Sequence, residues 1–94
     1  MTRIEQEDSN KKGRFTIYED DIFAGEMTYT WIDKYAFIIG HTGVEPDFEG
    51  KGYGKILAMN AVEFAREHKI KILPLCPYAK KVFDKDKSLE NVRF

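Results

Sequence analysis

The sequence predicts an α/β protein of the α+β kind, with one mixed sheet and two main helices. Three observations support this prediction. Apolar and polar residues alternate between Phe15 and Ile32, as in strands, and the period becomes helical after Gly54. A short alternating stretch follows at residues 70–75. The first region therefore predicts antiparallel N-terminal strands, and the strand-helix-strand succession predicts one right-handed parallel crossover.

The first elements are expected to form a β-hairpin. The polar stretch from Asp8 to Gly13 predicts a turn, and residues 15–18 alternate as a strand. A short turn at "EDDIF" leads to residues 24–32, which are rich in threonine and aromatic residues, as in strands. After another turn, residues 35–44 are apolar at nearly every position in their first half, which predicts a strand covered on both faces. We expect three aromatic residues in the core: Tyr29, Trp31 and Phe37.

Two helices are expected in the second half of the chain. The first should run from about Gly52 to His68, with an apolar stripe at Ile56, Leu57, Ala61, Phe64 and Ala65. Residues 70–75 then predict a strand. The second helix should span residues 76–85, because proline suits a first helical position, and the preceding residue should be its N-cap. We expect the charged stretch at residues 85–94 to be a solvated tail from which Leu89, Val92 and Phe94 dock on the sheet.

Composition limits the classes of partner. The 94 residues suit one domain, and 43% hydrophobic residues with 14% aromatic residues favour a folded globule. The formal net charge of -1 gives no general attraction to nucleic acid or to an anionic membrane. One cysteine excludes an internal disulfide, the chain begins with polar residues, and no apolar run approaches the roughly 20 residues of a membrane span. We therefore expect a cytoplasmic monomer with no metal site.

Three glycines stand at alternate positions where the first helix should begin: Gly50, Gly52 and Gly54. A helix N-terminus presents unpaired N–H groups and a partial positive charge, so this stretch could hold a phosphate, with Lys51 and Lys55 adding charge. The alternative is a tight connection that only needs a flexible backbone. A Walker A loop and a dinucleotide-binding loop are both excluded, because the glycine and hydroxyl positions that they require are occupied by other residues.

Residues 35–83 resemble the GNAT superfamily of acetyl-CoA-dependent N-acetyltransferases. The segment from Glu49 to Gly54 stands where that family has Gln/Arg-x-x-Gly-x-Gly/Ala. With "HTGV" at residues 41–44 and "LCPY" at residues 75–78, the resemblance is closest to a small, single-domain GNAT-like subfamily. It implies a truncated GNAT-like fold, acetyl-CoA or coenzyme A as co-substrate, and an amine acceptor that the sequence does not identify.

The resemblance also implies the residues that contact the cofactor. By position, the pantetheine arm would lie against Thr42, Gly43 and Val44, and the pyrophosphate against Gly50, Lys51, Gly52, Tyr53, Gly54 and Lys55. Three features depart from the family pattern. Glu49 replaces the usual Gln or Arg, and Val82 and Phe83 stand where many members have a proton-donating tyrosine. Residues 17–27 leave no room for the two helices that shape the amine site in larger members.

Three side chains are candidates for catalysis: Cys76, His41 and Tyr78. Cys76 caps a predicted helix, whose N-terminus stabilises a thiolate, so it could accept the acetyl group. A lone cysteine is, however, commonly a small buried apolar residue. His41 could take a proton from Cys76 or from the amine, or could simply hydrogen-bond at a strand end. Tyr78 is the one nearby hydroxyl that could act as a general acid.

Three functions remain open at this point. The first is an N-acetyltransferase, acting directly or through acetyl-Cys76. The second is a non-catalytic module that binds or senses acyl-CoA, which the missing amine-site helices and the absent tyrosine favour. The third is a redox or protein-interaction module in which Cys76 reacts with a partner thiol and the glycines are structural.

Overall fold

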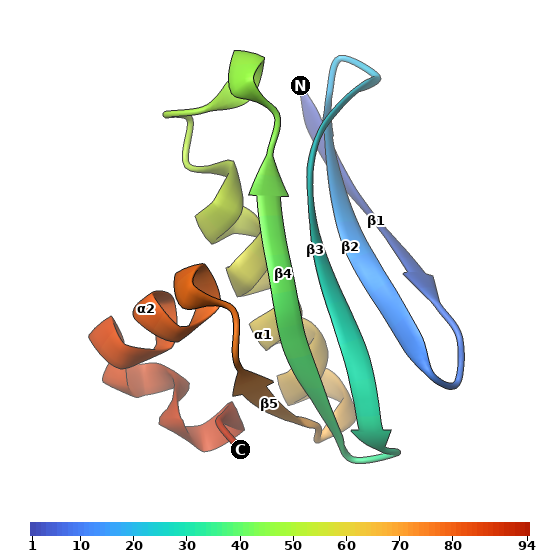
Figure 1. Ribbon diagram of the computed structural model, residues 1–94, viewed down its shortest axis with the longest axis vertical. Coiled ribbons are helices and arrows are strands. Elements are labelled where there is room, and N and C mark those ends of the chain that lie inside the picture. Colours follow the sequence, from blue (N-terminus) through green and yellow to red (C-terminus); the bar gives the residue numbers. More distant parts are fainter.

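One five-stranded sheet, with the order β1-β2-β3-β4-β5, runs through the computed structural model, which describes residues 1–94. Its first four strands pair antiparallel, and β5 pairs parallel with β4 through the crossover helix α1, which confirms the predicted mixed sheet (Figure 1). The strands are β1 (Thr2–Asp8), β2 (Lys12–Glu19), β3 (Ile22–Asp33), β4 (Ala36–Val44) and β5 (Lys71–Pro74). The helices are α1 (Tyr53–His68) and α2 (Pro77–Lys85), with 3-10 helices η1 (Pro46–Phe48) and η2 (Lys87–Val92).

Strand β1 was not predicted from the sequence. Its residues are polar on both faces, and only Ile4 is even partly buried. The strand therefore lacks the apolar alternation that identifies a half-buried strand. It forms because its backbone pairs with β2 along seven residues, at an edge of the sheet where polar side chains are tolerated.

The predicted hairpin is confirmed. Its two strands are joined by a tight turn at Asp20 and Asp21, both with positive φ, 50° and 68°, which suits the twist of a β-hairpin. Strands β2 and β3 follow each other across this turn without an intervening helix. This confirms the prediction that residues 17–27 contain only a short connection and no helices.

Helix α1 covers one face of the sheet and supplies much of the core. It lies behind the strands in Figure 1, whereas α2 stands beside β5, and the near face of β1–β3 carries no helix. Leu57, Ala61 and Ala65 are fully buried as predicted, but Ile56 is 41% exposed because it lies outside the face that packs on the sheet. Neither helix is long and apolar enough to cross a bilayer.

The aromatic residues of the core stack on the α1 side of the sheet. Tyr29 and Phe37 are buried with ring centroids 4.3 Å apart, which confirms two of the three predicted core aromatics. Trp31 packs its edge on Phe37 at 5.3 Å but remains partly exposed, because its indole N–H reaches out to the Asp8 carboxylate at 3.1 Å.

The C-terminal segment is more ordered than the predicted solvated tail. It forms η2, whose Leu89 and Val92 are buried in the core cluster, so two of the three predicted docking residues do dock. Phe94 was expected to dock through its side chain, which is instead 63% exposed. Its backbone N–H donates to the carbonyl of Ile72 on β5 at 2.8 Å, so the contact with the sheet is made by the main chain.

Strands β4 and β5 separate halfway along β4, and this positions the candidate site. They pair only from Ala36 to Ile39, where the Ile39 carbonyl accepts the N–H groups of both Leu75 and Cys76, at 3.1 and 3.0 Å. The pairing of β4 with β3 skips Gly40, which is a bulge that bends the strand. Beyond it, β4 continues with β3 on one side and no strand on the other (Figure 1).

Candidate functional site

The glycine turn, residues 50–54, links η1 to the first turn of α1. Gly50 and Gly52 have φ of +82° and +79°, a left-handed conformation that other residues adopt only with strain. A Cβ at either position would meet no atom within 4 Å, so the turn needs glycine there for its backbone conformation rather than for space. Gly52 is the N-cap of α1 and provides no side-chain cap.

Six successive amides, at residues 50–55, donate to no atom of the protein. The first helical hydrogen bond at this end runs from Ile56 N–H to the Gly52 carbonyl at 3.1 Å, and no side chain accepts from the preceding N–H groups. Left-handed residues that alternate with others, as Gly50 and Gly52 do here, are the backbone pattern of the anion-binding concavities called nests. Unpaired amides at the N-terminal end of a helix dipole are an arrangement that can accept an anion.

A hollow of about 330 Å³, here called the turn hollow, opens beside these amides. The Tyr78 ring forms one wall and lies against Gly54, where an added Cβ would stand 2.9 Å from the ring and 3.0 Å from its hydroxyl. Partial burial raises the pKa of Tyr78 above its ordinary value. The lining residues are Thr42, Val44, Phe48, Glu49, Gly50, Gly52, Tyr53, Gly54 and Tyr78.

The free edge of β4 faces this hollow. Glu45 donates its N–H to Ala24 of β3 at 2.8 Å, and hydrogen-bonded pairs alternate along an antiparallel ladder. The backbone N–H and C=O groups of Val44 and Thr42 therefore point away from β3, toward the side that β5 leaves open. An extended molecule with amide groups could pair with them as an added strand does.

Cys76 lies at the inner end of the opening. It is the N-cap of α2, as predicted, and its sulfur accepts the N–H of Ala79 at 3.3 Å. The Thr42 hydroxyl lies 3.3 Å from the same sulfur. The side chain is 5% exposed, so the thiol is covered in this structure but borders a residue that lines the turn hollow.

His41 and Gly43 lie on the other face of the sheet. Consecutive residues of a strand point to opposite faces, and Thr42 points toward Cys76 and the α1 side. The His41 imidazole is exposed and lies over Gly43, where a Cβ would stand 3.0 Å from Nε2. No hydrogen bond joins His41 to Cys76, whose polar neighbours are Thr42 and Ala79.

Two of the predicted cofactor residues are held by Glu19, at the end of β2. Lys51 Nζ lies 2.8 Å from the Glu19 carboxylate, and the Tyr53 hydroxyl donates to the same oxygen. The hydrogen bond from Lys51, with that from Tyr53, lowers the pKa of Glu19, so the carboxylate stays charged. The charge of Lys51 is thus already balanced, and the Tyr53 hydroxyl is already hydrogen-bonded within the protein.

Sequence reasoning did not identify Glu19 or Phe48 as part of this region. Glu19 is 32 residues from Lys51, and no local pattern connects them. Phe48 stacks on Tyr53 with ring centroids 6.3 Å apart, and an aromatic residue directly before a glycine-rich turn was the signal that could have found it. Lys55, predicted beside the pyrophosphate, contributes its amide to the turn, whereas its side chain lines a neighbouring hollow.

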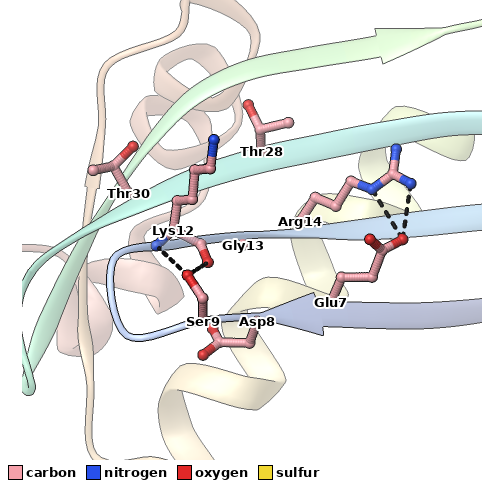
Figure 2. A pocket seen from close by; sticks show the side chains of 8 residues that line it. All are labelled: Glu7, Asp8, Ser9, Lys12, Gly13, Arg14, Thr28 and Thr30. Carbon is pink, nitrogen blue, oxygen red and sulfur yellow. Dashed lines mark hydrogen bonds and ion pairs between the residues drawn. The ribbon is translucent and has the colours of Figure 1, made fainter.

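A second polar hollow, here called the hairpin hollow, lies where β1 turns into β2 (Figure 2). Its volume is about 630 Å³, and none of its lining residues is hydrophobic. Figure 2 shows Arg14 joined to Glu7, at 2.8 Å, and Ser9 bonded to Lys12. Arg14 also pairs with Glu26 at 2.8 Å, so its charge is matched within the protein, whereas Lys12 forms no ion pair.

The comparisons with known proteins agree on the fold. The sequence matches the model of the GCN5-related N-acetyl-transferase family over residues 14–92. The chain is similar to the NMR structure of a GCN5-like protein from Staphylococcus aureus, with 33% identity over 98% of this chain and 87% of that chain, and a TM-score of 0.74. No curated protein matches the sequence.

Two more distant structures were solved with ligands. A GNAT family acetyltransferase from Elizabethkingia anophelis, with acetyl-CoA bound, has 10% identity over 89% of this chain and 72% of that chain, with a TM-score of 0.70. The N-acetylglutamate synthase of Neisseria gonorrhoeae, complexed with coenzyme A and N-acetyl-glutamate, has 20% identity over 77% of this chain and 18% of that chain, with a TM-score of 0.61. At these identities the likeness concerns the fold.

Proposed function

Since the chain belongs to the GCN5-related N-acetyltransferase family, we propose that it binds acetyl-CoA at the turn hollow and transfers the acetyl group to an amine. The observation that carries the proposal is the set of six unpaired amides at residues 50–55. A pyrophosphate supplies oxygens for these donors and negative charge for the helix N-terminus. The ligand of the Elizabethkingia structure supports the same cofactor.

The pantetheine arm would continue from this turn along the free edge of β4. Thr42 and Val44 direct their backbone groups there, and the arm carries two amides that can pair with them in the manner of a strand. The arm would thereby complete the sheet where β5 has turned away. Its thioester would reach the region of Cys76, where the Thr42 side chain points.

Transfer requires two proton movements. The neutral amine attacks the thioester carbonyl, the C–S bond breaks, and the coenzyme A thiolate leaves. Tyr78 is our candidate for the general acid that protonates this thiolate, since its hydroxyl lines the hollow and forms no hydrogen bond within the protein. His41 is exposed on the opposite face of the sheet from Thr42, so we assign it the proton that the amine loses only through an intervening water.

A two-step route through Cys76 is the second candidate, and the N–H of Ala79 on its sulfur favours it. The Cys76 thiolate would attack the thioester carbonyl, form acetyl-Cys76 and release coenzyme A as its thiolate. The amine would then attack acetyl-Cys76, release the Cys76 thiolate and lose a proton. Both routes give the same products, so only an intermediate distinguishes them.

Titration with acetyl-CoA and coenzyme A, followed by amide chemical shifts, tests binding. We expect the largest shifts at residues 50–55, because their N–H groups gain acceptors. Unchanged shifts at saturating acetyl-CoA would refute the proposal. Lys34, exposed at the β3–β4 turn, offers a control: its change to alanine should leave binding as it is.

Incubation with acetyl-CoA and a panel of amines and peptides, followed by intact-mass measurement, tests transfer. Acetylated amine supports the enzyme, and a protein mass increased by one acetyl group, absent in Cys76→Ala, supports the two-step route. Binding without transfer to any acceptor would instead support a non-catalytic acyl-CoA module. The tight β2–β3 turn, which leaves no helices for shaping an amine site, is the observation that favours that outcome.

A further inference from the structure

A third hollow lies between the first turn of α1 and the outer face of α2. Its volume is about 490 Å³, and it shares the Tyr78 ring with the turn hollow, so the two adjoin. Three of its six lining residues are lysines, which gives it the name lysine pocket. The lining residues are Lys55, Tyr78, Lys81, Val82, Lys85 and Asp86.

The lysines of this pocket have no acidic partner. Lys51 and Lys80 each lie 2.8 Å from a carboxylate, but Lys55, Lys81 and Lys85 form no ion pair. Asp86 is the one acid in the lining, and its carboxylate already accepts the N–H and the hydroxyl of Ser88, at 3.0 and 2.6 Å. The lining therefore carries a surplus of two positive charges.

The two helices bring these charges together. Lys81 and Lys85 are four residues apart on α2, so they project from the same side of that helix. Lys55 comes from α1 and connects the pocket to the turn, because its amide is one of the six unpaired donors and its side chain lines the pocket. Tyr78 and Val82 add the two apolar surfaces of the lining.

We propose that the lysine pocket binds the 3′-phosphate on the ribose of coenzyme A, with the adenine against Tyr78 and Val82. This inference rests on the proposed function, which places the pyrophosphate at the adjoining turn. The 3′-phosphate is a monoester, which carries about −1.5 to −2 charges at neutral pH. This charge matches the surplus of two positive charges in the lining of the pocket. It is also attached to the ribose next to the pyrophosphate, so the two phosphate sites must be neighbours.

Calorimetric titration with coenzyme A and with 3′-dephospho-coenzyme A tests this inference. We expect the wild-type protein to bind coenzyme A roughly 10-fold to 100-fold more tightly, the effect of one or two hydrogen bonds to a charged group. The double variant Lys81→Ala/Lys85→Ala should lose this preference and bind both ligands as the wild type binds the dephospho form. Both side chains are exposed, so the variant should fold, and Lys11→Ala, an exposed lysine in the β1–β2 turn, is the control that should keep the preference.

The outcomes separate this inference from the proposed function. Equal affinity of the wild type for the two ligands would overturn the lysine pocket and leave the acetyl-CoA site standing. A double variant that weakens both ligands equally would also overturn it, because the lysines would then attract the cofactor as a whole. Binding of neither ligand would refute the proposed function itself and the inference with it.

Discussion

The hairpin hollow and the turn hollow differ in how far their polar groups are paired within the protein. Arg14 bridges Glu7 and Glu26, and Ser9 closes its own turn (Figure 2). At the turn hollow six amides lack acceptors, and the adjoining pocket holds three lysines without acids. Most polar groups of the larger hollow are thus paired, whereas the smaller one offers unpaired donors, which is why we propose it as the ligand site.

The glycines of the two regions differ most in the space around them: Gly13 is tightly packed, whereas Gly50 and Gly52 have no atom within 4 Å of an added Cβ. A Cβ at Gly13 would stand 2.5 Å from the backbone carbonyl of Glu7 and from the Tyr29 hydroxyl. Gly13→Ala should therefore lower the free energy of unfolding by about 3 kcal/mol, the upper end of the usual cost of overpacking. Thermal and urea unfolding would measure this loss.

Gly40→Ala is the matched control for Gly13→Ala. Gly40 is also in a strand, but its Cβ would meet nothing within 4 Å, so its free energy of unfolding should stay within about 0.5 kcal/mol of the wild type. Equal stability of the Gly13→Ala and Gly40→Ala variants would show that the hairpin end is not tightly packed, and the contrast would fail.

Tyr78→Phe should affect chemistry and leave the fold intact. The ring that packs on Gly54 is kept, and only the hydroxyl, which makes no hydrogen bond to the protein, is lost. We expect kcat for acetyl transfer to fall about 100-fold, the lower end of the range for a general acid, with Kd for acetyl-CoA unchanged. The exposed Tyr35 offers the control, since Tyr35→Phe should change neither quantity. An unaltered kcat in Tyr78→Phe would remove this residue from the mechanism.

Gly52→Ala should weaken the cofactor site through the backbone. At a φ of +79° alanine costs about 1–2 kcal/mol. A turn that relaxes to avoid this strain misdirects its amides, so we expect roughly a 10-fold loss of affinity for acetyl-CoA, which corresponds to about 1.4 kcal/mol. Calorimetry would measure the change. Undiminished affinity would favour the third of the initial hypotheses, in which the glycines serve only the fold.

The smallest effect on stability is expected at Glu19. Its carboxylate is paired with Lys51, as the charge of Arg14 in the hairpin hollow is paired with Glu7. The pKa of Glu19 is lowered in the folded protein by the hydrogen bond from Lys51, so this contact stabilises the fold above the ordinary glutamate pKa and is lost as the pH falls through the folded value. Unfolding midpoints measured from pH 7 to pH 3 should therefore differ between wild type and Glu19→Gln at neutral pH and converge in acid. A constant difference across that range would exclude the ionised carboxylate as the cause.

Local patterns were sufficient for much of the fold and for the backbone of the site. The N-cap role of Cys76 follows from the proline after it, and the glycine turn follows from three glycines before a helical period. Strand β1 was missed because pairing through the backbone at a polar edge leaves no apolar signal.

The side-chain arrangement of the site was harder to predict, because it depends on contacts between distant elements. The pairing of Lys51 with Glu19 joins the glycine turn to the end of β2. The separation of His41 from Cys76 depends on which face of β4 His41 and Thr42 occupy after the bulge at Gly40, because Thr42 is the residue that contacts Cys76. No local sequence pattern indicates either the ion pair between Lys51 and Glu19 or the separation of His41 from Cys76.

The unpaired amides also affect the stability of the folded chain when a ligand is present. The left-handed residues that align these N–H groups exist only in the folded turn, so an anion held there binds the native state and not the unfolded chain. At a ligand concentration 100 times Kd, such binding adds about 2.7 kcal/mol to the free energy of unfolding. With acetyl-CoA at the turn, as we propose, resistance to heat and to proteases should therefore rise and fall with the supply of this ligand.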